Sequence, residues 1–140
     1  EVSEVYLRKL FKAQSGISPS KYLISVRLKN AQKLMKYPFL TLEECALQSG
    51  FSSLQYFCRL FKKNMGVSYL QYVYQIRTTA VCRELETTED PIGEIAERHG
   101  FRDPKMLNQY FREIYGCTPS EKRKFFREVA VEDTNGPEEE

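Results

Sequence analysis

The sequence repeats itself with a period of 50 residues. Phe11, Phe61 and Phe111 fall in register, each is followed by a basic residue, and a glycine stands five positions after each of them. Other residues recur at the same offset, among them Tyr22 and Tyr72, Arg27 and Arg77, Ala46 and Ala96, Gly50 and Gly100, and Phe51 and Phe101. So many matches at one offset indicate duplication, and the chain is expected to fold as tandem copies of one supersecondary unit.

Capping signals predict a short helix early in each complete copy. Thr41 with Glu44 three residues later is typical of a capping box, and Asp90 before Pro91 is typical of an N-cap followed by the first helical position. Short helices are therefore expected to begin near positions 42 and 91. They are expected to end at the glycines at 50 and 100, because a residue that tolerates positive φ lets the chain turn sharply.

A second helix is predicted after each of these turns. Ser53 and Asp103 are suitable N-caps, and Gly66 and Gly116 end the pattern about three turns later. A helix, a short turn that contains glycine and another helix form the helix-turn-helix signature. A helical hairpin is often only a piece of bundle core, so the faces of the second helices decide between the two interpretations.

These faces differ in polarity. The apolar stripes, expected in the core, consist of Leu54, Phe57, Leu60 and Phe61 in one copy and Leu107, Tyr110 and Phe111 in the next. The opposite faces carry Gln55, Arg59, Lys62 and Lys63, and Lys105, Asn108, Gln109 and Arg112. Arginine, lysine, asparagine and glutamine match the edges of guanine and adenine in the major groove, which favours DNA binding.

Longer helices are predicted to join the copies, at 19–36 and 69–86. Eighteen residues at 1.5 Å each span roughly 27 Å, not far below the ~34 Å of one duplex turn. The apolar residues of the first cover more than one narrow stripe: Tyr22, Leu23, Val26, Leu28, Ala31, Leu34 and Met35. We therefore expect each connecting helix to be buried at both ends, either as a rigid spacer or as an ordinary core helix.

Charge is distributed unevenly along the chain. The formal net charge is +2, but five of the 19 acidic residues lie in the last nine positions, so 21 basic residues face 14 acidic ones before that tail. A basic body favours a polyanionic partner, although many solvated surfaces are equally basic. Residues 129–140 are predicted to form an acidic disordered tail.

Several classes of protein are not expected. The sequence has no apolar run of the ~18 residues that a membrane span needs, and nothing resembles a signal peptide. Four cysteines without a CxxC pair and a single histidine predict neither a zinc site nor a disulfide framework, and they favour a reduced, cytoplasmic location. No nucleophile and base pair, phosphate-binding glycine loop or paired carboxylate motif appears, so we expect no enzyme activity and no cofactor.

From residue 3 to about 127 the sequence resembles the DNA-binding domain of the AraC/XylS family of bacterial transcription regulators. One set of motifs resembles the end of the family's first helix-turn-helix with its connecting helix, at Leu10-Phe11-Lys12, Gly16-Ile17-Ser18-Pro19, Tyr22-Leu23, Arg27-Leu28, Ala31 and Leu34-Met35. A second set resembles the family's second unit, at Leu42, Cys45-Ala46, Gly50-Phe51, Tyr56-Phe57, Arg59 and Phe61-Lys62-Lys63. A third resembles that unit again, at Ile95-Ala96, Gly100-Phe101, Phe111, Gly116, Thr118-Pro119-Ser120 and Arg123.

The resemblance implies an all-α fold of tandem helix-turn-helix units joined by long connecting helices. It implies a partial first unit at 1–36 with a recognition helix at 3–13, a complete unit with its connecting helix at 41–86, and a C-terminal unit at 90–128. Base-facing residues would be Val5, Arg8, Lys9, Gln55, Cys58, Arg59, Lys105, Asn108 and Gln109. Phosphate contacts, which position the protein without reading sequence, would be made by Lys12, Lys62, Lys63, Arg102 and Arg112.

The implied function is sequence-specific binding of double-stranded DNA and regulation of transcription, with RNA polymerase as a further candidate partner and no membrane. The alternative is a helical protein-interaction module derived from a DNA-binding domain. The family has two units, whereas this sequence has two complete copies and one partial copy, so two pairings are open and the pair at 41–128 is favoured. Because the first residue is Glu1 and the first unit is incomplete, we expect a fragment whose effector or sensor domain lies outside it.

The repeat register also assigns the remaining candidate residues. Cys45 and Cys117 align with aliphatic residues and are expected to be small buried hydrophobes. Cys58 aligns with Arg8 and Asn108, so it is expected on the exposed face, as a surface cysteine, a contact to a thymine methyl or a thiol sensor. His99, which precedes a turn glycine, is expected to be structural or on the surface.

Overall fold

The computed structural model describes residues 1–136, and in that part every regular element is an α-helix. The all-α prediction is therefore confirmed. The chain divides into two compact units, Glu1–Ser68 (unit 1) and Tyr69–Glu140 (unit 2). This division assigns the predicted connecting helix at 69–86 to the last helix-turn-helix rather than to the copy that begins at 41.

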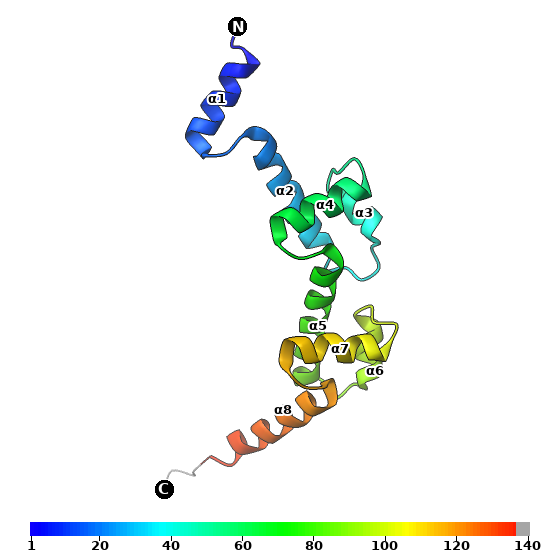
Figure 1. Cartoon of the computed structure of the whole chain (residues 1–140). Coiled ribbons are helices and arrows are strands. Elements are labelled where there is room, and N and C mark those ends of the chain that lie inside the picture. Colours follow the sequence, from blue (N-terminus) through cyan, green and yellow to red (C-terminus); the bar gives the residue numbers. More distant parts are fainter. Residues whose placement is uncertain (137–140) are drawn as a thin grey trace. The chain divides into compact units, whose positions relative to one another are not determined.

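Unit 1 consists of α1 (Glu4–Ser15), α2 (Pro19–Leu34), α3 (Leu42–Gln48) and α4 (Leu54–Met65). Helix α2 contacts α1 and α3, and α3 packs against α4 (Figure 1). Each helix begins at a hydroxyl side chain that accepts a hydrogen bond from the first turn, at Ser3, Ser18, Thr41 and Ser53. The capping box predicted at Thr41 and Glu44 is present.

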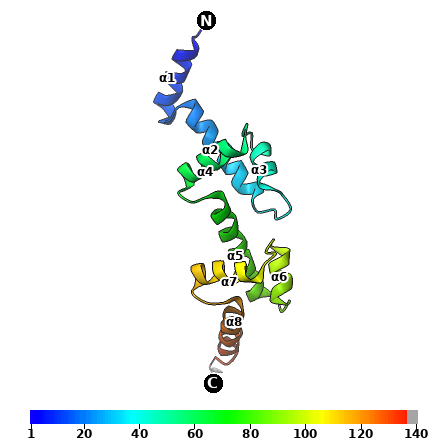
Figure 2. The same ribbon diagram turned by 45° about the vertical axis from the view of Figure 1, so that its right-hand side comes forward.

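Unit 2 consists of α5 (Tyr69–Thr87), α6 (Ile92–Arg98), α7 (Pro104–Tyr115) and α8 (Pro119–Thr134). Helix α5 contacts all three of the others, and α6 packs against α7 (Figure 2). A second capping box joins Thr118 and Glu121 at the start of α8. Unit 2 therefore surrounds one long helix with a helix-turn-helix and a final helix.

Buried residues of the two units match at the 50-residue offset. In unit 2 the core cluster consists of Val81, Cys82, Leu85, Ile95, Ala96, Phe101, Leu107 and Phe111. In unit 1 the buried apolar residues are Leu28, Ala31, Met35, Cys45, Ala46, Phe51, Phe57 and Phe61. Seven of the eight positions coincide, and only Cys82 has a different counterpart, since Gln32 stands there and Leu28 is buried instead. The duplication thus extends from the sequence to the packing.

The N-cap predicted at Asp90 is wrong. Pro91 is the N-cap of α6, and no side chain caps that helix. The Asp90 carboxylate instead accepts a hydrogen bond from Arg98 at 3.0 Å, and the Asp90 carbonyl accepts one from the buried Arg123 at 2.6 Å. These two arginines, one from α6 and one from α8, fix the loop in a conformation that leaves Asp90 outside the helix.

Two groups of predicted core residues are more exposed than expected. Tyr22 and Leu23, in the first half of α2, are about half exposed, while the buried residues of α2 lie in its second half. Leu54 is also exposed, because it stands at the first position of α4, beside the turn. The connecting helix of unit 1 is therefore buried at one end only among the described residues.

Helix α8 continues to Thr134, so residues 129–134, which we expected to be disordered, are helical. The last four residues of the predicted tail, 137–140, lie outside the described part of the chain. Helix α8 is in register with α2 and α5, but its outer half differs from theirs. Glu128, Val131, Glu132 and Asn135, which align with core or core-flanking positions of α2 and α5, are all exposed.

Among residues 1–136, no helix combines the length and the apolar character that crossing a membrane requires.

Candidate nucleic-acid interface

The turn between α3 and α4 has a defined geometry. Gly50 has φ +92°, the left-handed conformation that favours glycine. The Phe51 amide then donates to the Ala46 carbonyl at 3.0 Å, and the Phe51 ring packs on Phe57 with 5.0 Å between centroids. Ser53 accepts a hydrogen bond from the Tyr56 amide at 3.1 Å, which starts α4. The turn therefore sets the direction of α4 relative to α3.

The turn between α6 and α7 repeats this arrangement. Gly100 has φ +81°, and the Phe101 amide donates to the Ala96 carbonyl at 2.9 Å. Asp103 caps α7 by accepting from the Lys105 amide at 2.9 Å. Both helix-turn-helix pairs predicted from the sequence are thus formed, with the second helix of each oriented by equivalent contacts.

An arginine from the long helix lies against each turn glycine. The Arg27 side chain of α2 lies so near Gly50 that a Cβ there would be 3.1 Å from its Nε. In unit 2 the Arg77 guanidinium donates from Nη1 to the Gly100 carbonyl at 3.4 Å, and a Cβ on Gly100 would lie 2.8 Å from that nitrogen. Each glycine is therefore required twice, by its positive φ and by the arginine beside it.

These arginines are absent from the residues predicted to be functional. The signal was available, because Arg27 with Arg77 and Gly50 with Gly100 recur at the same offset. A repeated arginine 23 residues before a repeated glycine could have been interpreted as a contact between the long helix and the turn. Charge patterning alone does not show this, since arginine is more often a surface residue.

The outer face of α4 is accessible. Gln55, Arg59, Lys62 and Lys63 are all exposed, opposite the fully buried Phe57 and Phe61. The Arg59 guanidinium lies over the Tyr56 ring, 5.5 Å from its centroid. This contact restrains the arginine while its donors stay available to a ligand.

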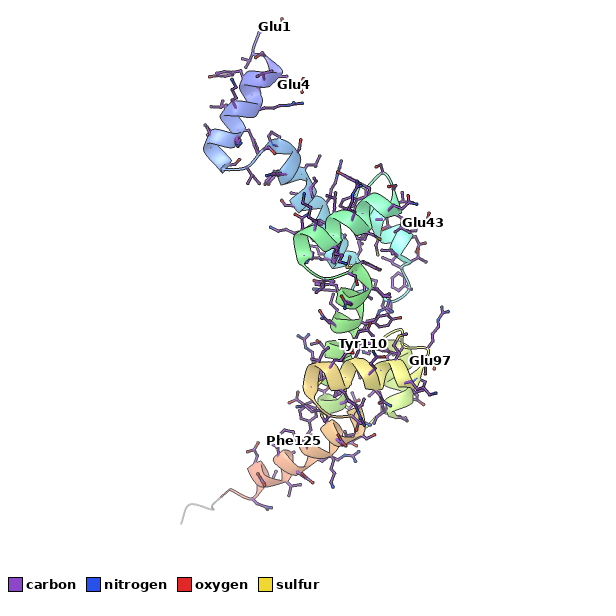
Figure 3. The ribbon with its side chains drawn as sticks, viewed as in Figure 1. Glu1, Glu4, Glu43, Glu97, Tyr110 and Phe125 are labelled. Atoms are coloured by element: carbon purple, nitrogen blue, oxygen red, sulfur yellow. The ribbon has the colours of Figure 1, made fainter. Side chains whose placement is uncertain are left out.

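The outer face of α7 has the same character. Lys105, Asn108, Gln109 and Arg112 are exposed opposite Leu107 and Phe111, and Arg102 is exposed in the preceding turn. The Gln109 amide donates to Glu113 at 3.3 Å. The inner side of α7 is anchored by Tyr110, labelled in Figure 3, whose ring stacks on Tyr74 of α5 with 5.0 Å between centroids.

Helix α1 presents Val5, Arg8, Lys9 and Lys12, all of them exposed. It has no buried residue, and it packs against α2, where Phe11 meets Tyr22 with 5.7 Å between ring centroids. Arg8 forms an ion pair with Glu4 one turn earlier.

The predicted exposure of Cys58 is wrong. Its side chain is half-buried, and burial raises the pKa of the thiol above its ordinary value. A raised pKa keeps the sulfur protonated and less nucleophilic near neutral pH, which argues against a reactive sensor thiol. Cys45 is buried as predicted, Cys117 is half-buried, and all four cysteines are thiols in the described part of the chain.

A polar network lies behind the α6–α7 turn. Glu84 of α5 accepts from Arg98 at 2.6 Å, and its other oxygen lies 3.0 Å from Nε2 of His99. Arg98 also contacts Asp90 at 3.0 Å. His99 is therefore structural, as expected, and joins the turn to the long helix. No group of three potential metal ligands occurs among the described residues.

The candidate residues form three sets, one on each of α1, α4 and α7. The sets of α1 and α4 lie in unit 1, and the set of α7 lies in unit 2. Each set has two or three exposed donor side chains and, nearer the helix C-terminus, one or two basic residues. Such a helix, held at the end of a fixed turn, can enter a major groove and donate to base edges and phosphates.

Comparison with known proteins supports this geometry. A family described as a helix-turn-helix domain matches this chain twice, at residues 1–68 and 55–124. The multiple antibiotic resistance protein MarA of Escherichia coli strain K12 is 32% identical over 84 residues, which are 60% of this chain and 65% of MarA. The chain spans less than two thirds of the length of the curated relatives that it matches.

Two solved structures have the same fold. The C-terminal domain of AraT, a response regulator from Geobacillus stearothermophilus, aligns with a TM-score of 0.60 and 30% identity over 77% of this chain and 86% of that one. The DNA-binding domain of AdpA, a global transcriptional factor solved in complex with a target DNA, aligns with a TM-score of 0.61 and 29% identity, covering 76% of this chain and 94% of that one.

Proposed function

This chain belongs to the AraC/XylS family of helix-turn-helix DNA-binding domains, and we propose that it binds double-stranded DNA sequence-specifically and thereby regulates transcription. Helices α4 and α7 are the recognition helices, since each is the second helix of a complete pair. Gln55, Cys58, Arg59, Lys105, Asn108 and Gln109 face the bases. Lys62, Lys63, Arg102 and Arg112 contact phosphates.

The observation that carries this proposal is the equivalence of the two helix-turn-helix pairs. The same turn, with glycine at φ +92° and +81°, orients two helices whose outer faces carry exposed amide and cationic side chains. The residues that both faces expose are amides and cations, the side chains that donate to base edges and to phosphates. The likeness to the DNA-binding domain of AdpA, solved with a target DNA, supports the same function.

Half-buried Cys58 has a narrower role than its neighbours. A thiol with a raised pKa is a weak hydrogen-bond donor, so it reads no base edge by charge. It can contact a thymine methyl, which is an apolar interaction. Cytoplasmic location, contact with RNA polymerase and control by an effector or sensor domain outside this chain complete the proposed role.

Titration of the chain with duplex DNA at several salt concentrations tests the proposal. We expect the logarithm of the binding constant to fall linearly with the logarithm of salt concentration, because cationic side chains release counterions from phosphates. We also expect a selected site to be preferred over random duplex by roughly 10³-fold or more. A flat salt response, or equal affinity for random DNA, would instead favour the protein-interaction alternative.

A further inference from the structure

The three sets of exposed residues on α1, α4 and α7 can be compared position by position. The helices have equal lengths of 12 residues, begin at N-caps in register and end at glycines with φ of 81°, 77° and 71°. At the position proposed to contact phosphate, all three helices have a cation: Lys12, Lys62 and Arg112. All three of these side chains are exposed.

The proposed base-facing positions behave differently. At the centre of the outer face stand Lys9, Arg59 and Gln109, and one turn earlier stand Val5, Gln55 and Lys105. No two helices have the same residue at either position, although each of these side chains is exposed. Three recognition helices that contact the same kind of DNA backbone but different base sequences need a cation at the phosphate position in every helix. They also need different side chains at the base-facing positions.

We propose that α1 is a third recognition helix and that the chain reads three successive major-groove subsites, with α4 at the middle one. This inference rests on the proposed function, which it extends from two subsites to three. Helix α4 then belongs to two pairs of recognition helices: it is the second helix of the pair with α1 and the first helix of the pair with α7.

The two family matches support this double role of α4. They share residues 55–68, and α4 ends at Met65 within that shared segment. Each match, taken by itself, contains two recognition helices and the long helix between them: α1, α2 and α4 in the first, and α4, α5 and α7 in the second.

The connections agree with this pairing. Helix α2 follows α1 through Gly16-Ile17-Ser18, and α5 follows α4 through Gly66-Val67-Ser68. Arg27 of α2 then contacts the turn between α3 and α4, and Arg77 of α5 contacts the turn between α6 and α7. Equivalent contacts thus connect α1 to the helix-turn-helix that contains α4, and α4 to the helix-turn-helix that contains α7.

Lys9 is the residue of α1 that tests the inference best. Arg8 is already paired with Glu4, whereas Lys9 is exposed and aligns with Arg59 and Gln109. Because α1 has no buried residue, replacing Lys9 leaves the packing of unit 1 unchanged. Lys33, exposed in α2, provides a control with the same loss of charge outside the recognition helices.

The experiment is selection of bound duplexes from a random library with the intact chain and with Lys9→Ala, Arg59→Ala, Gln109→Ala and Lys33→Ala. The intact chain is expected to select three subsites spaced by about 10 base pairs, the repeat of the major groove. Lys9→Ala should relax the base preference within one outer subsite, Arg59→Ala within the middle one and Gln109→Ala within the other outer one. Lys33→Ala should keep all three preferences.

Two outcomes would overturn the inference and leave the proposed function intact. One is selection of only two subsites, with preferences that Lys9→Ala does not alter. The other is a Lys9→Ala variant that binds every sequence more weakly without changing any preference, as a phosphate contact does. If the intact chain selects no sequence at all, both the proposed function and the assignment of α1 as a third recognition helix are wrong.

Discussion

Arg59 and Lys62 lie one turn apart on α4, but we expect them to meet different parts of the duplex. Arg59→Ala is expected to lose about 1–3 kcal/mol on the selected site and to relax preference at one base, because a bidentate contact to guanine would be removed. Lys62→Ala is expected to weaken all sequences alike and to reduce the salt slope by about 1. Binding isotherms on cognate and random duplexes measure both effects. Uniform weakening by Arg59→Ala would show that this arginine contacts phosphate.

The exposure of a candidate residue was predictable from the sequence where its helical position faced solvent and its side chain was long enough to extend there. Arg59 and Lys105 stand near the middle of the faces opposite the apolar stripes, so their exposure follows from helical periodicity alone. Cys58 stands at the flank of its stripe, as Arg8 and Asn108 do. A long or polar side chain extends from that position into solvent, whereas the short thiol stays against the helix. The repeat register therefore gave the position of Cys58 correctly and its exposure wrongly.

At the scale of elements, the two glycines near α6 are expected to respond in opposite ways to alanine. Gly100→Ala should destabilise unit 2 by at least about 1–2 kcal/mol, because φ is +81° and the new Cβ would lie 2.8 Å from Arg77. Gly93→Ala should stabilise it by about 0.5–1 kcal/mol, because Gly93 lies inside α6 with open space around the added carbon. Urea unfolding followed by circular dichroism measures both. A Gly100→Ala variant as stable as the parent would mean that the turn relaxes without cost.

Helix boundaries were predictable where a cap acts within its own helix. Ser53 and Asp103 cap the helices that we expected, since each side chain bonds to an amide two or three residues later. The residues next to Asp90 predicted an N-cap equally well, but Arg98 of α6 and Arg123 of α8 donate hydrogen bonds to Asp90 instead. Because one of these contacts spans 33 residues, no local pattern could have revealed it.

For the molecule as a whole, the copies of the repeat are not energetically equivalent. Leu7 and Leu107 are in register, but Leu7 is 53% exposed and Leu107 is 2% exposed. Leu107→Ala is expected to cost about 2–5 kcal/mol because it leaves a cavity in the core of unit 2. Leu7→Ala is expected to change stability by no more than about 0.5 kcal/mol. Equal losses in urea unfolding would mean that α1 is covered in solution by a surface outside the described contacts.

The polar outer half of α8 has a consequence for protein engineering. Helices α2 and α5 pack against the helix-turn-helix that follows them through residues such as Ala31 and Val81. In α8 the equivalent residue is Val131, and the exposed Glu128 and Glu132 flank it. A further unit fused after α8 would therefore meet a surface on which two carboxylates flank a single valine, more polar than the surfaces that α2 and α5 offer. Lengthening the array to read more DNA would require redesigning that surface first, with α5 as the template for its side chains.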